Sequence, residues 1–315
     1  MLKYGLIGVT VTVLATLTIC KPIDPQDSSE HGVTQGQLKN NCTCGWVNRS
    51  PQRIIGGEET GVNEWPMMAA LIRREIMGIK NMFFCGGSIL TTRHVLTAGH
   101  CIHDEQGRPF SEHEIGVVLG AHKLSKVNYN DPKVMRTPEK LIKHPNYVWP
   151  ITQDIAIIIL PTIQFSQIIG PVCLPTEWHD LEDKKLKVTG WGYTSPSGPP
   201  SDVLKKTDLI GYNHGVCGKK YIGTVLGAVF DLKNVYQICT SQPATSQCRG
   251  DSGGPIMRLN KQTNRYEQVG VVSYGHPRCR DYPAVSSSVH YFTPWIQHVI
   301  STTFPEEKTC AKQSA

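Results

Sequence analysis

Residues 248 to 255 are Cys248-Arg249-Gly250-Asp251-Ser252-Gly253-Gly254-Pro255, and this stretch decides the fold of the 315-residue chain. Two further stretches precede it, Thr97-Ala98-Gly99-His100-Cys101 and Gln153-Asp154-Ile155-Ala156. A serine hydroxyl is a poor nucleophile at neutral pH, so an imidazole must take its proton and a buried carboxylate must orient that imidazole. His100, Asp154 and Ser252 are therefore candidates for the base, the orienting carboxylate and the nucleophile.

Each stretch alone also has a purely structural interpretation, as a tight turn, a structural histidine or a charge at a strand edge. Together, in the order His, Asp, Ser and behind Arg53-Ile54-Ile55-Gly56-Gly57, they favour catalysis. This order and its flanking residues resemble the chymotrypsin-like serine proteases, from Ile54 to about Ile300. The resemblance implies a serine endopeptidase that acts on proteins or peptides.

The hydrophobic pattern from Ile54 onward indicates an all-β fold. Short β-branched and apolar runs alternate with Gly, Pro and Asn turns, as at residues 86–90, 155–160, 186–189 and 269–274. The resemblance implies two antiparallel six-stranded β-barrels with the active site in the cleft between them. We expect a C-terminal helix over Thr293–Ile300, with Thr293 as its N-cap and Pro294 at its first position.

The resemblance also implies activation by proteolysis. Cleavage after Arg53 frees the amino group of Ile54, which is expected to pair with the buried carboxylate of Asp251. This pairing orders the oxyanion hole, formed by the backbone amides of Gly250 and Ser252. The uncleaved chain is therefore predicted to be nearly inactive.

The resemblance places Ser246 at the base of the primary specificity pocket, where trypsin-like enzymes carry an aspartate. Without that carboxylate a buried substrate guanidinium lacks its partner, so we expect chymotrypsin-like cleavage after Phe, Tyr, Leu or Met. An unusual polar or narrow preference is the next alternative, and a trypsin-like preference requires another carboxylate such as Asp281. An upstream trypsin-like protease is then needed for activation.

The other expected pocket residues are Gln247, Ser273, Gly275 and Ala284, with Ser286 at a place where tyrosine is common. Ser273 also matches a serine that supports the catalytic aspartate.

The chain has eleven cysteines, and removal of Cys20 with a signal peptide leaves ten that can all pair. The resemblance implies three bridges inside the protease, Cys85–Cys101, Cys217–Cys239 and Cys248–Cys279. It further implies that Cys173 tethers the propeptide. Its partner is Cys44 or Cys42, and the cysteine left over would meet Cys310.

The N-terminal region predicts secretion. In residues 1–20, Lys3 precedes an apolar stretch that is too short and too rich in threonine for a membrane span, which favours a signal peptide over an uncleaved anchor. Residues 21–39 are polar, and residues 21–53 are predicted to form a disulfide-tethered propeptide. Residues 54–300 would form the protease domain and 301–315 a C-terminal tail. We expect an extracellular protein with no membrane attachment after signal removal.

Two asparagines, Asn41 and Asn48, begin Asn-X-Ser/Thr sequences and are predicted glycosylation sites. The stretches 41–46 and 63–68 are similar to secreted arthropod proteases of venom and saliva. This likeness suggests a venom, salivary or digestive enzyme, with protease inhibitors such as serpins among its partners.

Composition excludes other classes of protein. The net charge is +6, yet the basic residues are scattered and no nucleic-acid motif accompanies them, so no nucleic-acid partner is expected. We predict no cofactor and no metal, because the stretch that matches a calcium loop begins Ala121-His122-Lys123 and the histidines form no zinc pattern.

Two rival functions remain. A silent homologue acting as a binding protein would usually lack a residue of the catalytic triad, and Ser246 argues against a cascade protease cleaving after arginine.

Overall fold

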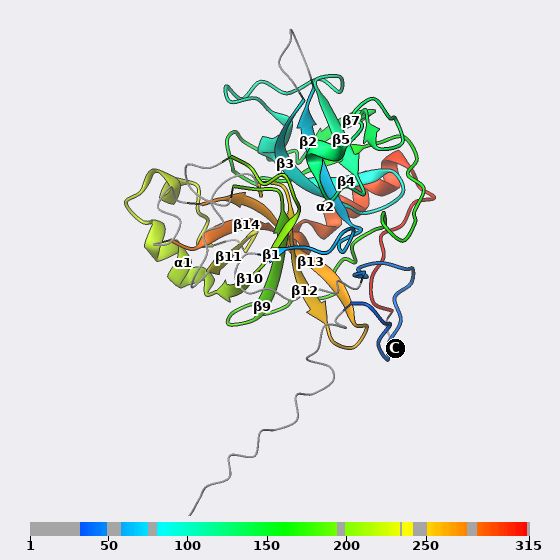
Figure 1. The fold of residues 1–315 in the computed structure, drawn as a ribbon. Coiled ribbons are helices and arrows are strands. Elements are labelled where there is room, and N and C mark those ends of the chain that lie inside the picture. Colours follow the sequence, from blue (N-terminus) through cyan, green and yellow to red (C-terminus); the bar gives the residue numbers. More distant parts are fainter. Residues whose placement is uncertain are drawn as a thin grey trace, which may run out of the picture.

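The computed structural model describes residues 32–48, 58–74, 81–193, 199–233, 235–241, 251–275 and 282–313. Two antiparallel sheets make up most of this part of the chain (Figure 1). The expected all-β architecture with a C-terminal helix is confirmed. Arg53, Ile54, Ser246, Gln247, Cys248, Gly250 and Cys279 lie outside the described residues.

The first sheet has the strand order β6-β5-β2-β3-β4-β8-β7, and every neighbouring pair is antiparallel. Its strands β2, β5 and β8 are apolar and buried along nearly all of their length, whereas the edge strand β7 has no buried residue. The strands are β2 (Met68–Arg73), β3 (Met82–Ile89), β4 (His94–Thr97), β5 (Ile115–Leu119), β6 (Met135–Arg136), β7 (Lys140–Lys143) and β8 (Ala156–Ile159).

The second sheet has the order β1-β10-β11-β14-β13-β12-β9, and an additional β9–β10 pairing closes it into a barrel. Each sheet contains seven strands among the described residues where six were expected, since each includes a two-residue strand, β1 or β6. The strands are β1 (Glu58–Glu59), β9 (Lys185–Gly190), β10 (Lys205–Tyr212), β11 (Gln237–Ser241), β12 (Pro255–Asn260), β13 (Arg265–Tyr274) and β14 (Ala284–Ser288).

The C-terminal helix α2 (Val289–Thr303) begins four residues earlier than expected, so the predicted cap and first position were wrong. Thr293 lies inside the helix, where its hydroxyl donates to the Val289 carbonyl, and Pro294 is also internal. Phe292, buried against the first sheet, shows why: packing of this earlier turn stabilises helix that the local sequence did not require. None of the helices in the described residues is long and apolar enough to span a membrane.

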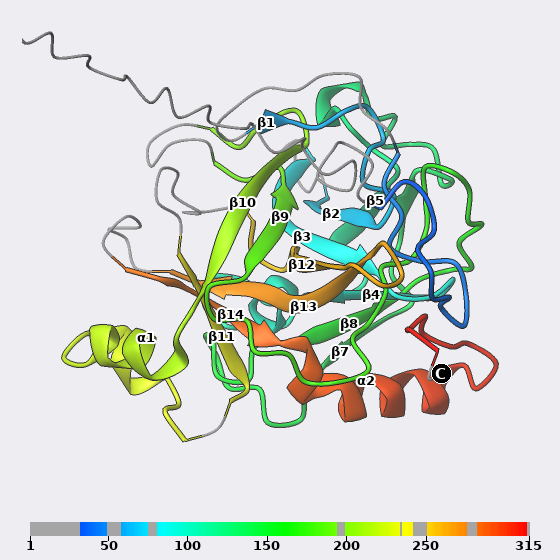
Figure 2. The ribbon, with the colours of Figure 1, turned by 90° about the horizontal axis from the view of Figure 1, so that it is seen from below.

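The sequence pattern did not predict helix α1 (His214–Tyr221), which begins before Cys217 and extends into the region between Cys217 and Cys239. Figures 1 and 2 show it projecting from the second sheet beside β11. The Asn213 side chain caps it by accepting from the Val216 amide. Three short 3-10 helices complete the secondary structure of the described residues, η2 (Gly99–Ile102), η3 (Leu124–Lys126) and η4 (Val225–Ala228).

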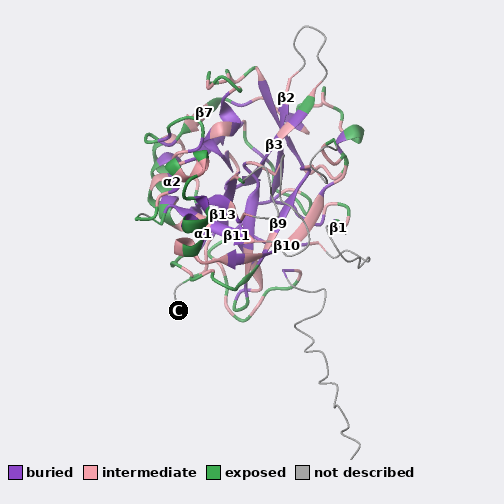
Figure 3. Cartoon of the chain, turned by 90° about the vertical axis from the view of Figure 1, so that its left-hand side faces the viewer, coloured by how far each residue is buried: buried purple, intermediate pink, exposed green. Residues whose placement is uncertain are grey.

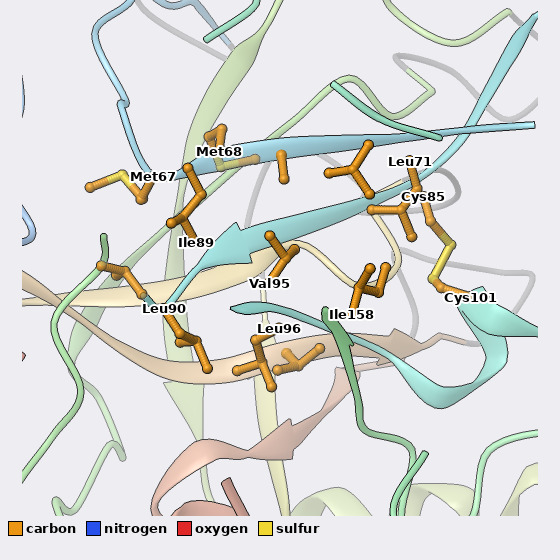
Figure 4. Packing of buried hydrophobic residues seen from close by; sticks show 14 of the residues in the cluster. Met67, Met68, Leu71, Cys85, Ile89, Leu90, Val95, Leu96, Cys101 and Ile158 are labelled. Atoms are coloured by element: carbon orange, nitrogen blue, oxygen red, sulfur yellow. A yellow bond between two sulfur atoms is a disulfide. The ribbon is translucent and has the colours of Figure 1, made fainter. Parts of the chain in front are cut away.

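The largest apolar core is built mainly on the first sheet and α2, and it also includes Met257 and Val271 of the second sheet; buried residues are purple in Figure 3. Figure 4 shows side chains from β2, β3, β4 and β8 meeting there, with Leu71, Ile89 and Leu96 fully buried. Complete burial of one such side chain stabilises the fold by about 1.5–3 kcal/mol relative to its exposure. A separate core fills the second barrel and includes Val188, Ile256 and Val272. The smaller core thus lies within the second sheet, whereas the larger one joins the two sheets.

Residues 32–48 run beside the C-terminal tail (Figures 1 and 2). Two disulfides, Cys42–Cys310 and Cys44–Cys173, hold this segment. The backbones of Asn40 and Lys312 also form an isolated antiparallel β-bridge. The structure thus selects between the two pairings that the sequence left open. The described residues contain two further disulfides, Cys85–Cys101 and Cys217–Cys239.

Candidate active site

His100 and Asp154 meet because β4 and β8 are paired. Thr97 at the end of β4 lies opposite Ala156 at the start of β8. His100 follows Thr97 by three residues and Asp154 precedes Ala156 by two, so both emerge at the same end of this strand pair. Asp154 Oδ2 lies 2.7 Å from His100 Nδ1, and Asp154 Oδ1 accepts from the His100 backbone amide at 2.8 Å.

The Asp154 carboxylate is buried, with 1% of its surface exposed, and the second sheet supplies further donors to this residue. Ser273 on β13 donates its hydroxyl to Asp154 Oδ2 at 2.5 Å. Ser287 on β14 donates to the Asp154 backbone carbonyl at 2.6 Å. A buried carboxylate is tolerated only when its oxygens are hydrogen-bonded, and these contacts provide that. Both barrels therefore contribute to one carboxylate.

The pKa of His100 reflects opposing influences. Burial disfavours the imidazolium, but the charge of Asp154 and its hydrogen bond together outweigh burial and raise the pKa of His100 above its ordinary value. When the neutral ring donates from Nδ1 to Asp154, the lone pair lies on Nε2. His100 is thus arranged to take a proton at Nε2 and to be stabilised once it has done so.

Ser252 lies in a turn that packs against strand β3 and against the 3-10 helix η2, which contains His100. Its carbonyl accepts from the Gly86 amide at 2.7 Å. The next residue, Gly253, has φ +77°, and a Cβ there would lie 3.0 Å from Cys101 Sγ. Only glycine combines this backbone conformation with so close an approach. The turn is therefore held next to Cys101 and hence to His100.

The disulfide between Cys85 and Cys101 reinforces this arrangement, because Cys85 precedes Gly86 and Cys101 follows His100 (Figure 4). Among the described residues, no hydrogen bond joins Ser252 Oγ to His100 Nε2. The His100 Nε2 atom instead lies 3.6 Å from Cys101 Sγ. Catalytic hydrogen bonds are often longer or misaligned before substrate binds, so this geometry is compatible with proton transfer in the complex.

Asp251, beside Ser252, is half-buried, with its carboxyl against the backbone around Trp191. Its Oδ1 accepts from the Gly192 amide at 3.2 Å, and a Cβ on Gly190 would lie 2.2 Å from the same oxygen. Burial raises the pKa of Asp251 to about 6, and the Gly192 hydrogen bond offsets this only in part. No cationic group in the described part of the chain forms an ion pair with Asp251. The carboxyl thus lies in a pocket that lacks an ion-pair partner among these residues.

Of the expected specificity residues, three are described. Ser273 faces Asp154. Gly275 is exposed at the end of β13, and Ala284 begins β14 with its side chain half-buried.

The two candidate glycosylation sites differ in their surroundings. Asn41 is exposed, and its side chain contacts the tail at Thr309 and Ala311. Asn48 Nδ2 donates to the carbonyls of Asn63 and Gln167 at 2.7 and 2.8 Å. Attachment of a sugar at Nδ2 removes one of its two hydrogens. Modification of Asn48 would therefore disrupt at least one of these contacts.

One group of potential metal ligands in the described residues is close enough to hold an ion, namely Cys85, His100 and Cys101. Both cysteines are in the disulfide, and a disulfide supplies no thiolate for a metal. Of these three residues, only His100 therefore offers a ligand atom that is not in a disulfide.

Two contributions to the site were not foreseen from the sequence. The role of Ser287 was missed, although three consecutive serines at residues 286–288 in an otherwise apolar strand were a usable signal. The close packing around Gly99, beside His100, is the second contribution. In the structure a Cβ on Gly99 would lie 2.6 Å from a ring carbon of Tyr147, so the missing side chain makes room for that ring.

Comparisons with known proteins agree with this geometry. Residues 54–296 match the family described as Trypsin. The chain is 35% identical to Venom serine protease 34 of Apis mellifera, over 86% of this chain and 62% of that protein. It is 33% identical to Venom serine protease of Polistes dominula over 82% and 89% of the two chains. Identity to Proclotting enzyme of Tachypleus tridentatus is also 33%, over 82% and 69%. The match thus spans less than two thirds of the bee protein's length. The chain belongs to the trypsin family and is a serine endopeptidase.

Proposed function

We propose that His100, Asp154 and Ser252 are the catalytic triad of this endopeptidase. The hydrogen-bonded pair of His100 and Asp154, placed beside the Ser252 turn, is the observation that supports it most strongly. Ser252 Oγ attacks the scissile carbonyl carbon while His100 Nε2 takes its proton. The imidazolium then protonates the leaving amine as the C–N bond breaks. Water hydrolyses the resulting acyl-serine through the same base.

The oxyanion formed in this reaction needs backbone donors, for which we propose the amides of Gly250 and Ser252. Losing one such donor raises the barrier by about 2.7–4 kcal/mol in other serine proteases. We further propose that cleavage after Arg53 frees the Ile54 amino group to pair with Asp251. The carboxyl of Asp251 has no ion-pair partner among the described residues, and burial raises its pKa. Both observations support this proposal, because a cation there would offset the cost of burial.

Residues 21–53 would then remain attached as a light chain to the protease domain of residues 54–300. The bridges Cys44–Cys173 and Cys42–Cys310 support this, since both join residues before Arg53 to residues after it. The activating enzyme is proposed to be a trypsin-like protease, because Ser246 gives the primary pocket no carboxylate for arginine.

We propose a secreted enzyme that cleaves after Phe, Tyr, Leu or Met and acts in venom, saliva or digestion, under control of protease inhibitors such as serpins. The names of the bee and wasp relatives support the venom role. The relative named Proclotting enzyme favours a second candidate, a cascade protease that cleaves another zymogen after arginine.

A fluorogenic peptide library varied at the residue before the scissile bond separates these candidates. The chain is cleaved after Arg53 by an added protease, which is then removed, and Ser252→Ala is the control. Cleavage after aromatic residues or leucine, absent in the control, supports the main proposal. A preference for arginine or lysine supports the cascade candidate, and no hydrolysis of any peptide contradicts both.

A further inference from the structure

Gln153, the residue before Asp154, has an unusual backbone conformation. Its φ is +46°, in the left-handed region that residues other than glycine rarely adopt. The other non-glycine residues with positive φ in the described part of the chain are all Asn or Asp, which tolerate this region best: Asn63, Asp183 and Asn264. Gln153 is the exception, so a contact elsewhere must hold its backbone in this conformation.

The backbone around Asp154 forms a tight turn. The Ile155 amide donates to the Gln153 carbonyl at 3.0 Å, which closes a three-residue turn centred on Asp154. The direction of the Asp154 carboxylate therefore depends on the conformation of Gln153. Relaxation of Gln153 to a negative φ would rotate the peptide that precedes Asp154 and shift the carboxylate relative to His100.

Ser287 restrains this turn from the second sheet. Its hydroxyl donates to the Asp154 backbone carbonyl at 2.6 Å, and both residues are buried. Within the described ranges, no other group donates to this carbonyl. Ser287 lies on β14, which pairs with β11 through Gln237 and with β13 through Val271. The donor is therefore held on both sides by the sheet, and its position is set by the second barrel.

We propose that Ser287 is a positioning residue for peptide hydrolysis: it holds the strained turn at Gln153 and thereby fixes Asp154 against His100. This inference rests on the proposed triad and extends it to a contact with the backbone of Asp154. Ser273 bonds the carboxylate itself, whereas Ser287 fixes the chain from which the carboxylate extends. Loss of the Ser287 hydroxyl would leave a buried carbonyl without its donor and would allow Gln153 to relax.

The first test is Ser287→Ala in the enzyme cleaved after Arg53. We expect kcat to fall by about tenfold on one peptide with little change in KM, because Ser287 is buried behind Asp154. Rates are expressed per site that reacts with a fluorophosphonate, so that misfolded protein is not counted. Ser287→Thr keeps a hydroxyl at this position and should retain kcat within about threefold of the parent.

Ser288→Ala is the matched control for this substitution. Ser288 is the next residue of β14 and is also buried, but its side chain makes no capping bond to α2. This variant should leave kcat unchanged. An equal fall in kcat in Ser288→Ala, or no rescue by Ser287→Thr, would overturn the assignment to the Ser287 hydroxyl.

The pH profile separates positioning from a purely structural role. Asp154 raises the pKa of His100, so a displaced carboxylate should move the midpoint of the kcat/KM profile down towards the ordinary value of 6.5 in Ser287→Ala. A variant that is only less stable keeps the midpoint of the parent. An unchanged kcat, or a lower kcat with an unchanged midpoint, would overturn the inference while leaving the proposed triad intact.

A second substitution tests the link to Gln153. Glycine adopts positive φ without strain, so Gln153→Gly added to Ser287→Ala should restore kcat by at least about threefold. Asp183→Gly is the control in the same background, because Asp183 also has positive φ but precedes β9. No recovery with Gln153→Gly, or the same recovery with Asp183→Gly, would overturn the inference. Absence of any hydrolysis that depends on Ser252 in the parent enzyme would instead contradict the proposed function.

Discussion

The substitution Asp251→Asn, made in the chain before cleavage at Arg53, isolates the free-energy cost of burying the charged Asp251 carboxylate. Activation is proposed to relieve this cost. Burial raises the pKa of Asp251 from 3.8 to about 6. A difference of two units at about 1.4 kcal/mol each corresponds to about 3 kcal/mol. Because the folded pKa is the higher one, this cost is absent below about pH 4, develops between pH 4 and 6, and is complete above pH 6. Asparagine keeps an acceptor for the Gly192 amide and carries no charge.

The uncleaved Asp251→Asn variant should therefore be about 3 kcal/mol more stable than the parent at pH 7.5, and within about 1 kcal/mol of it at pH 4. Urea unfolding followed by tryptophan fluorescence, with disulfides intact and Ser252→Ala in both chains to prevent self-digestion, measures this difference. After cleavage at Arg53 the order should reverse, because only aspartate can pair with the new amino terminus. Equal stabilities at pH 7.5, or a difference that does not depend on pH, would refute the argument.

Three further outcomes test other parts of the account. Because His100 must be neutral to accept a proton and its pKa is raised, kcat/KM should rise with pH through a midpoint above 6.5; a midpoint below 6.5 would contradict the electrostatic description. Ser273→Ala removes a hydrogen bond to the Asp154 carboxylate and should lower kcat by about tenfold with little change in KM, measured on one peptide. An unchanged kcat would show that Ser273 does not support catalysis. Replacing both Cys42 and Cys310 by serine should lower the free energy of unfolding by about 2–4 kcal/mol, while Cys44–Cys173 still holds the light chain on a non-reducing gel; release of the light chain would show that one bridge is insufficient.

The sequence was informative where function demands particular residues at fixed places along the chain. The stretches around His100 and Asp154 predicted two side chains that meet, and the β4–β8 pairing explains how. The Ser252 turn lies against Cys101, the residue after His100, and its part in catalysis stays a prediction. The all-β fold followed from the alternation of short apolar runs and turns. In these respects local pattern and tertiary structure agree.

The sequence was less informative where packing between distant segments decides the outcome. Helix α2 begins before Thr293 because Phe292 is buried, whereas the capping pattern alone placed its start at a plausible but later residue. Cys42 and Cys44 are two residues apart, so only the path of the segment beside the tail distinguishes their partners. Likewise, the close packing of Gly99 against the Tyr147 ring depends on a neighbour far away in the sequence.

The most direct test of the central claim is covalent labelling with a fluorophosphonate, which reacts with activated serine hydroxyls. The account predicts one adduct, located on Ser252 by peptide mass spectrometry, in the chain cleaved after Arg53. It also predicts almost no labelling of the uncleaved chain or of His100→Ala. An adduct on another residue, or no adduct despite verified cleavage after Arg53, would contradict the proposed triad.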